Sequence, residues 1–211
     1  MVAPPDRGIY LASRSPRRRE LLTQIGVRYH LLLFRERADS GLDVSEDPHP
    51  GEAPDAYVER VARAKAEAGW RRMQQRNLPH APVLAADTTV ALEGRIFAKP
   101  ADRKEAAAML AALSGRSHEV LTAIALQTDD RLESALSRSE VRFKDLAAQE
   151  IADYLATGEA DDKAGAYAIQ GRAARFVAEL RGSYSGVMGL PLYETAQLLE
   201  RATRPRERKF S

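Results

Sequence analysis

An aspartate inside an apolar segment is the first residue of this sequence that suggests chemistry. Asp87 lies within the run 83–92, where most residues are aliphatic, and this pattern predicts a buried strand. A carboxylate in such surroundings must be paired, hydrogen-bonded or bound to a metal, because burial of an unpaired charge is costly. Two interpretations stay open: a structural ion pair, or a carboxylate that holds Mg²⁺ or activates water beside a phosphate-binding lysine.

The Glu-Gly turn at 93–94 predicts what lies opposite Asp87. If the chain folds back symmetrically about this turn, Thr88 faces Lys99 and Asp87 faces Pro100. We therefore expect the ammonium group of Lys99 beside the carboxylate of Asp87.

A second candidate site lies where a short apolar segment gives way to a helix. Residues 13–18, Ser-Arg-Ser-Pro-Arg-Arg, place Ser15 at the cap and Pro16 at the first position of that helix. A helix N-terminus attracts anions through its free N–H groups, and arginines there oppose the helix dipole unless an anion binds. A capped surface helix with solvated arginines remains an alternative, while the conflict with the dipole favours phosphate binding.

A third segment, 161–171, surrounds Tyr167 and Gln170 with glycine and alanine, as expected where a backbone approaches a flat ligand. By itself this pattern favours a structural strand. The sequence contains neither a Walker-type phosphate loop nor G-x-G-x-x-G. His118 has no second histidine four residues further on, so we interpret it as structural rather than zinc-binding.

Hydrophobic periodicity and turn residues predict the elements that must position these side chains. Strands are expected at 8–12, 29–34, 82–92, 95–98, 120–127, 133–143, 164–170 and 175–180, and helices at 16–25, 54–75, 102–115, 147–156 and 192–201, with a long polar loop at 35–53. Because helices alternate with pairs of adjacent strands, we predict the α/β class, with a mixed sheet and flanking helices.

Composition restricts the functions that are open to the chain. It has 211 residues, of which 44% are hydrophobic and 29% charged, as in one ordinary globular domain. The absence of cysteine excludes disulfides, thiolate chemistry and Cys-ligated zinc, and four scattered histidines argue against a histidine metal cluster. Without a membrane-length apolar segment or a leader, we expect no membrane partner and a cytoplasmic location.

The charge distribution argues against a stable nucleic-acid partner. Of the net charge of +2, residues 204–211 contribute +3, from four basic residues and one glutamate, which leaves −1 for residues 1–203. A nucleic-acid-binding face needs clustered basic residues. We therefore expect one domain over 1–203 and a disordered basic tail over 204–211.

Taken together, six separated motifs resemble the Maf (septum formation) family of nucleoside triphosphate pyrophosphatases. The motifs are 11–18, 57–65, 86–90 with 97–100, 113–120, 162–171 and 182–191, in the order that the family has them. The resemblance implies an elongated fold shared with inosine triphosphatases, with two lobes around an active-site cleft. It also implies a cytoplasmic homodimer that acts on a nucleoside triphosphate.

The resemblance assigns roles residue by residue. Asp87 matches the catalytic carboxylate, and Glu46 matches an acidic residue that, with Asp87, would hold a divalent metal cation, Mg²⁺ or Mn²⁺. Positions tied to substrate choice are Arg17, Thr88 and Gln170, and polar positions around the phosphates are Ser13, Arg18, Lys65 and Lys99.

The residues at the selective positions favour dTTP and UTP over 7-methyl-GTP. In the 7-methyl-GTP subgroup these positions hold an aromatic residue, a larger amide and an acid, which suit a cationic base. Here Gln170 offers a donor and an acceptor without charge, as the imide edge of uracil or thymine requires. We thus expect a dTTP/UTP pyrophosphatase that also accepts modified pyrimidines. The alternative is a non-catalytic, nucleotide-binding regulator of cell division, and DNA binding through the tail is a weaker one.

Overall fold

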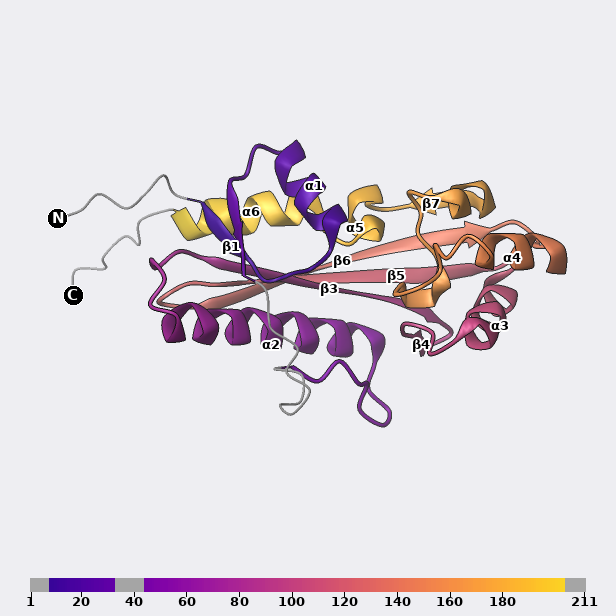
Figure 1. The fold of residues 1–211 in the computed structure, drawn as a ribbon, viewed down its shortest axis with the longest axis horizontal. Helices are drawn as coiled ribbons and strands as arrows, with labels where there is room; N and C mark the ends of the chain where they lie inside the picture. Colours follow the sequence, from indigo (N-terminus) through magenta and orange to yellow (C-terminus); the bar gives the residue numbers. More distant parts are fainter. Residues whose placement is uncertain (1–7, 33–43, 204–211) are drawn as a thin grey trace.

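One mixed β-sheet runs through an elongated molecule, which the computed structural model describes over residues 8–32 and 44–203 (Figure 1). The strands are β1 (Ile9–Leu11), β2 (Tyr29–Leu31), β3 (Val83–Leu92), β4 (Arg95–Phe97), β5 (Ser117–Gln127), β6 (Leu132–Phe143) and β7 (Val177–Arg181). They follow the order β2-β1-β3-β5-β6-β7, with β4 on β3. Strand β1 pairs in parallel with β2 and β3, and the other pairs are antiparallel, which confirms the predicted mixed sheet.

Helices cover both faces of the sheet. They are α1 (Pro16–Gln24), α2 (Pro54–Gln75), α3 (Arg103–Leu113), α4 (Ala148–Leu155), α5 (Tyr184–Met188) and α6 (Leu192–Thr203). Helix α2 lies along one face, α1, α5 and α6 lie against the other, and α3 and α4 gather at one end of the long hairpin β5–β6 (Figure 1). A hydrophobic cluster fills each of these three regions, so the sheet is buried where helices cover it.

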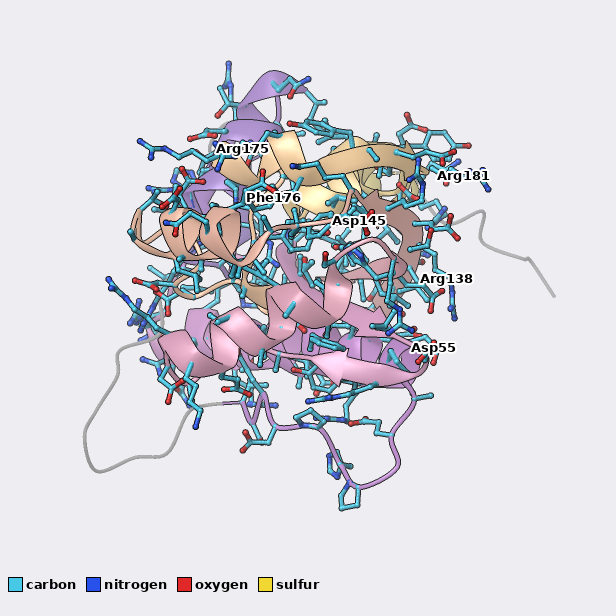
Figure 2. The ribbon with its side chains drawn as sticks, turned by 90° about the vertical axis from the view of Figure 1, so that its right-hand side faces the viewer. Asp55, Arg138, Asp145, Arg175, Phe176 and Arg181 are labelled. Carbon is cyan, nitrogen blue, oxygen red and sulfur yellow. The ribbon has the colours of Figure 1, made fainter. Side chains whose placement is uncertain are left out.

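An ion pair ties the first turn of α2 to the sheet. Asp55 in that turn binds the guanidinium group of Arg138 on β6, and the two side chains meet at the surface in the end view of Figure 2. Behind this turn the apolar face of α2 packs on β3 and β5. The helix is therefore fixed along its length against the strands that carry the candidate site.

Strand pairing along one edge of β3 is interrupted around Asp87 and Thr88. One edge pairs with β5 from Val83 to Ala91. The other edge pairs with β1 at 83–84 and with β4 at 90–92. Between these two contacts, residues 85–89 have no strand partner on that edge among the described residues, so the sheet leaves an opening beside Asp87.

One sequence prediction of an element is wrong, and one element was missed. Residues 164–170 do not form a strand: 164–166 make a single 3₁₀ turn, in which Gly165 and Ala166 have positive φ values of 66° and 60°. A side chain at Gly165 would lie 2.9 Å from Val90, so the turn is set by close packing that no local pattern reveals. The short helix α5 was not predicted.

The other elements agree with prediction within a few residues. Helix α2 has the predicted bounds. The strand predicted at 175–180 is β7, preceded by a 3₁₀ turn at 172–176. The strand predicted at 29–34 is present as β2 over 29–31, and Leu32 lies outside it. Residues 33 and 34, like the tail 204–211, lie outside the described residues.

Candidate active site

A cavity of about 810 Å³ opens at the interrupted edge of β3. Its walls come from the β1–α1 connection, α2, the segment before α2, the segment after β4, residues 162–170 and α5. Every candidate site residue from the sequence lines it: Ser13, Arg17, Arg18, Glu46, Lys65, Asp87, Thr88, Lys99 and Gln170. The fold therefore brings together residues that are as far as 157 positions apart in the chain, from Ser13 to Gln170.

Asp87 and Glu46 share one ammonium group. Nζ of Lys65 lies 2.7 Å from Oδ1 of Asp87 and 2.8 Å from Oε1 of Glu46. At the other oxygen of Glu46, Oε2 lies 3.4 Å from Nζ of Lys99. Asp87 is only 7% exposed. Positive and negative groups thus alternate along this wall, and each carboxylate has a cationic partner.

The predicted ammonium partner of Asp87 is the wrong lysine. The two strands do fold back symmetrically about the turn, but β4 ends at Phe97, so the ladder stops before it reaches Lys99. The ammonium group on Asp87 comes from Lys65 of α2, and Lys99 contacts Glu46 instead. Strand register describes only the paired residues, and a helix on the face of the sheet supplies the contact.

Helix α2 positions two groups of the site. Tyr57 and Lys65 are eight residues apart and so project from one face of the helix. The hydroxyl of Tyr57 donates to the backbone oxygen of Glu46 at 2.8 Å and holds the segment before the helix. Burial, and then the charges of Asp87 and Glu46, raise the pKa of Tyr57. It therefore remains a donor at neutral pH. The sequence analysis missed this tyrosine, whose apolar neighbours in the helix suggest only core packing.

Opposing effects act on the carboxyl group of Glu46. Burial raises its pKa, but the charge and hydrogen bond of Lys65, and then those of Lys99, outweigh burial and leave the pKa below its ordinary value. Glu46 is thus an anion at neutral pH, which a metal ligand or a partner for a cationic side chain requires.

Arg18 joins three parts of the fold at the floor of the cavity. Its Nε donates to the backbone oxygen of Gly189 at 2.7 Å, after the end of α5. Its Nη1 donates to Oγ of Ser13 at 3.1 Å, and its Nη2 to Oγ1 of Thr88 at 3.3 Å. Burial lowers the pKa of Arg18 and the charge of Asp87 opposes this, so the guanidinium group remains a cation.

Arg17 and Gln170 offer hydrogen-bonding groups that the protein leaves open. Nε of Arg17 is buried and has no partner within the described part of the chain. The Gln170 side chain is exposed at the cavity, and among residues 8–32 and 44–203 it makes no side-chain hydrogen bond. Lys163, which the sequence analysis did not single out, adds an ammonium group to this wall. Burial, and then the nearby Arg17, lower the pKa of Lys163.

Two buried tyrosines hold the segment that carries Gln170. Oη of Tyr154 accepts a hydrogen bond from the N–H group of Ala168 at 3.3 Å. Oη of Tyr167 lies 2.8 Å from Nε2 of His118, which is 2% exposed. This contact agrees with the structural interpretation of His118. Tyr154 of α4 and His118 of β5 therefore hold the segment that carries Gln170.

The charged groups of the cavity indicate the kind of ligand that it can bind. The cavity combines one buried carboxylate, a second ionised carboxylate and several cations, a set that fits a phosphorylated ligand with a divalent cation. Within the described residues no three acidic or histidine side chains form a metal cluster, so phosphate oxygens would have to complete the coordination of such a cation. The fold and the site thus define an α/β protein with a cleft for a polyphosphate ligand.

The chain belongs to the Maf family. The model of that family, described as "Maf-like protein", matches residues 8–202. Curated relatives extend this match over nearly the whole length of both proteins. A "dTTP/UTP pyrophosphatase" of Aromatoleum aromaticum is 63% identical over 201 residues, which are 94% of this chain and 97% of the relative.

Two further relatives have the same name and similar coverage. The protein of Nitrosomonas europaea is 56% identical over 95% of this chain and 97% of its own length. That of Nitrosospira multiformis is 59% identical over 92% of this chain and 94% of its own length. Among solved structures, the Staphylococcus aureus Ham1 protein matches 67% of this chain and 73% of its own, with a TM-score of 0.44 at 17% identity, a likeness too low to support an argument.

In the described part of the chain, none of the helices combines the length and the apolar character that a membrane span needs.

Proposed function

We propose that this protein hydrolyses dTTP and UTP to the nucleoside monophosphate and pyrophosphate. The observation that carries the proposal is the buried Asp87, held by Lys65 at the edge of a cleft rich in cations. The proposal is supported by the relatives named dTTP/UTP pyrophosphatase, which share more than half of their residues with this chain.

The reaction needs a water molecule activated next to the α-phosphate. Water attacks the α-phosphorus, the bond from that phosphorus to the bridging oxygen breaks, and pyrophosphate leaves with the electron pair. One oxygen of Asp87 is held by Lys65, while Oδ2 has no partner among the described residues and can take the proton of the water. Arg18, Lys65 and Lys99 line the cavity and would offset the charge that develops on the leaving pyrophosphate.

Mg²⁺ or Mn²⁺ fits the carboxylate pair of this site. Asp87 and Glu46 are hard oxygen ligands, and they already share the cationic head of Lys65, so this position stabilises positive charge. When bound, the metal would neutralise phosphate charge and help to orient the triphosphate. Few protein ligands are needed, because Mg²⁺ is usually held by one or two carboxylates together with substrate phosphates.

Base selection rests on the wall formed by Arg17, Thr88 and Gln170. The open amide of Gln170 can both donate to and accept from the imide edge of uracil or thymine. A 5-substituent does not alter that edge, so modified pyrimidine triphosphates should also be substrates. Arg17 carries a positive charge that disfavours the cationic base of 7-methyl-GTP.

Pyrophosphate release from a panel of nucleotides tests the proposal. The protein is incubated with dTTP, UTP, 5-methyl-UTP, CTP, ATP, GTP and 7-methyl-GTP, each with Mg²⁺ or Mn²⁺. We expect release of pyrophosphate and monophosphate from the first three, abolished by EDTA and restored by added metal. Tight binding without release from any nucleotide would instead support the non-catalytic regulator.

We also propose a cytoplasmic homodimer, on the strength of the family resemblance. Light scattering coupled to gel filtration should give twice the mass of 23.3 kDa for the chain. A mass of one chain at micromolar concentration would contradict the dimer.

A further inference from the structure

A buried threonine next to the cleft has no role in the function proposed so far. Thr122 lies on β5, directly opposite Thr88 in the antiparallel pair β3–β5, and is 1% exposed. It does not line the cavity, whereas Thr88 does. Thr88 is the one residue of β3 that is not fully buried. The pair thus joins the interior of the sheet to the surface of the cleft.

The neighbours of Thr88 determine which hydrogen bond its hydroxyl group can offer. A threonine hydroxyl has one proton and two lone pairs. Oγ1 of Thr88 accepts from Nη2 of Arg18 at 3.3 Å and lies 2.9 Å from Oγ1 of Thr122. These two neighbours take two of the three hydrogen-bonding positions of the hydroxyl group. No further protein group among the described residues bonds to it, so the third position is left for the substrate in the cleft.

Thr122 is held in place by α5. Its hydroxyl group lies 2.7 Å from the backbone oxygen of Gly186 and 2.9 Å from Oγ1 of Thr88. The other neighbour of Thr88 is held just after the same helix, because Nε of Arg18 donates to the backbone oxygen of Gly189 at 2.7 Å. Helix α5 and the residue that follows it therefore fix both groups that bond to Thr88.

We infer that Thr122 is a positioning residue that orients the hydroxyl group of Thr88, so that its remaining hydrogen-bonding position faces a polar group of the substrate in the cleft. This inference rests on the proposed function for the identity of the substrate. The imide edge of the pyrimidine and the triphosphate both offer such a group. Asp87 projects from the opposite face of β3, towards Lys65 of α2, so the two threonines act separately from the catalytic carboxylate.

A double-mutant cycle tests whether Thr122 acts through Thr88. The variants are Thr122→Val, Thr88→Val and the double variant, with Thr122→Ser to restore the hydroxyl group. The measurements are calorimetric affinity for α,β-imido-UTP, which does not require turnover, and kcat/KM for UTP. We expect Thr122→Val to weaken both by about tenfold, Thr122→Ser to recover them within about twofold, and the double variant to match Thr88→Val.

Thr195→Val is the matched control. Thr195 is a fully buried threonine on α6 that donates to the backbone oxygen of Pro191 at 2.7 Å and does not line the cavity. This variant loses the same kind of hydroxyl group, so it should lower thermal stability and leave affinity and kcat/KM unchanged. Its behaviour separates loss of a buried hydrogen bond from loss of the oriented Thr88 hydroxyl group.

Comparison of UTP with 4-thio-UTP tests whether Thr88 bonds to the 4-carbonyl of the base. Sulfur accepts hydrogen bonds more weakly than oxygen, so a bond from Thr88 to the 4-carbonyl makes the wild type prefer UTP. Both valine variants should then lose that preference. Equal losses on the two substrates would place the partner of Thr88 on a group that both substrates share.

Two results would overturn the inference. One is a Thr122→Val variant with wild-type affinity for α,β-imido-UTP. The other is a Thr122→Val effect that is as large in the Thr88→Val background as in the wild type. Failure of the proposed function would look different, because the wild type would then release no pyrophosphate while the binding cycle could still be measured.

Discussion

Asp87 combines burial, one fixed oxygen and one open oxygen. Lys65 holds Oδ1, and the 7% exposure of Asp87 keeps bulk water from competing for the carboxylate. A carboxylate that is oriented in this way can accept a proton from a water molecule in the cavity without first losing a shell of solvent. Because Lys65 holds Asp87 through this contact, a replacement of Lys65 would also change the orientation of the Asp87 carboxylate.

Replacement of Asp87 by Asn keeps the shape of the side chain and removes its charge. We expect kcat for dTTP to fall by at least about a hundredfold, the lower range for loss of a general base. Asp129→Asn is the control, since Asp129 pairs with His80 on the exposed turn between β5 and β6. Steady-state pyrophosphate release measures both. Near-normal turnover in Asp87→Asn would show that another group activates the water.

Gln170→Glu changes the group that faces the base. The change replaces an amide donor with a charged acceptor that the imide edge does not match, at a cost of about 1–3 kcal/mol. We expect kcat/KM for dTTP and UTP to fall by about tenfold or more, with a smaller effect on CTP. The four values for dTTP, UTP, CTP and 7-methyl-GTP give the measurement. A wild type that prefers 7-methyl-GTP would refute the proposed selectivity.

Sequence patterns predicted a helix or strand correctly where its contacts join residues that are close together in the chain. The spacing of Asp102 and Glu105 is typical of a capping box at the start of α3, and half of it forms: Asp102 accepts from the N–H group of Glu105 at 2.8 Å. The Glu105 carboxylate accepts from Ala101 at 2.7 Å, one residue before the cap. Residues 164–170 were predicted wrongly, because the turn there depends on contact between Gly165 and Val90 of β3, which are 75 positions apart.

Helix α2 carries Lys65, and its distance from the sheet is set at Gly69. A side chain at this position would lie 2.8 Å from Cγ1 of Val83 and 3.1 Å from Cβ of Ala12. A larger residue must therefore push the helix away from β1 and β3. That movement would also withdraw Lys65, one turn earlier, from Asp87.

We predict that Gly69→Val lowers the free energy of unfolding by about 1–3 kcal/mol, the usual cost of overpacking, and lowers kcat as well. Glu67→Val is the matched control, because Glu67 is an exposed residue of the same helix and bears the same cost of a β-branched side chain. Urea denaturation measures stability, and pyrophosphate release measures kcat. Equal stability of the two variants would contradict the close packing at Gly69.

At the scale of the molecule, the sequence predicted the class of fold and the members of the site better than their contacts. Alternating helices and strands indicate a mixed sheet, but hydrophobic periodicity says nothing about which strands pair. The opening beside Asp87 exists because β1 and β4 pair with opposite ends of one edge of β3. That arrangement, and the choice of Lys65 over Lys99, depend on tertiary packing.

A buried histidine in the described part of the chain should make the stability of the whole molecule depend on pH. Burial, only partly opposed by the backbone of Arg116, lowers the pKa of His118 to about 4 from the ordinary 6.5. The folded state therefore binds the proton less readily than the unfolded state. Stability is complete above pH 6.5 and is lost as the pH falls towards 4. The pKa of Glu52, lowered to about 2 from 4.5 mainly by Arg60, has its effect below this range.

Wild-type protein should lose about 2 kcal/mol of stability between about pH 7.5 and about pH 5 through His118 alone. The glutamine of His118→Gln does not titrate, yet it keeps a polar group beside Tyr167. The stability that this variant loses between the two pH values should therefore be smaller than the loss of the wild type by about 2 kcal/mol. Urea titrations of the two proteins at both pH values give the comparison. Parallel losses in the wild type and His118→Gln would mean that His118 does not bind its proton more weakly in the folded state than in the unfolded chain.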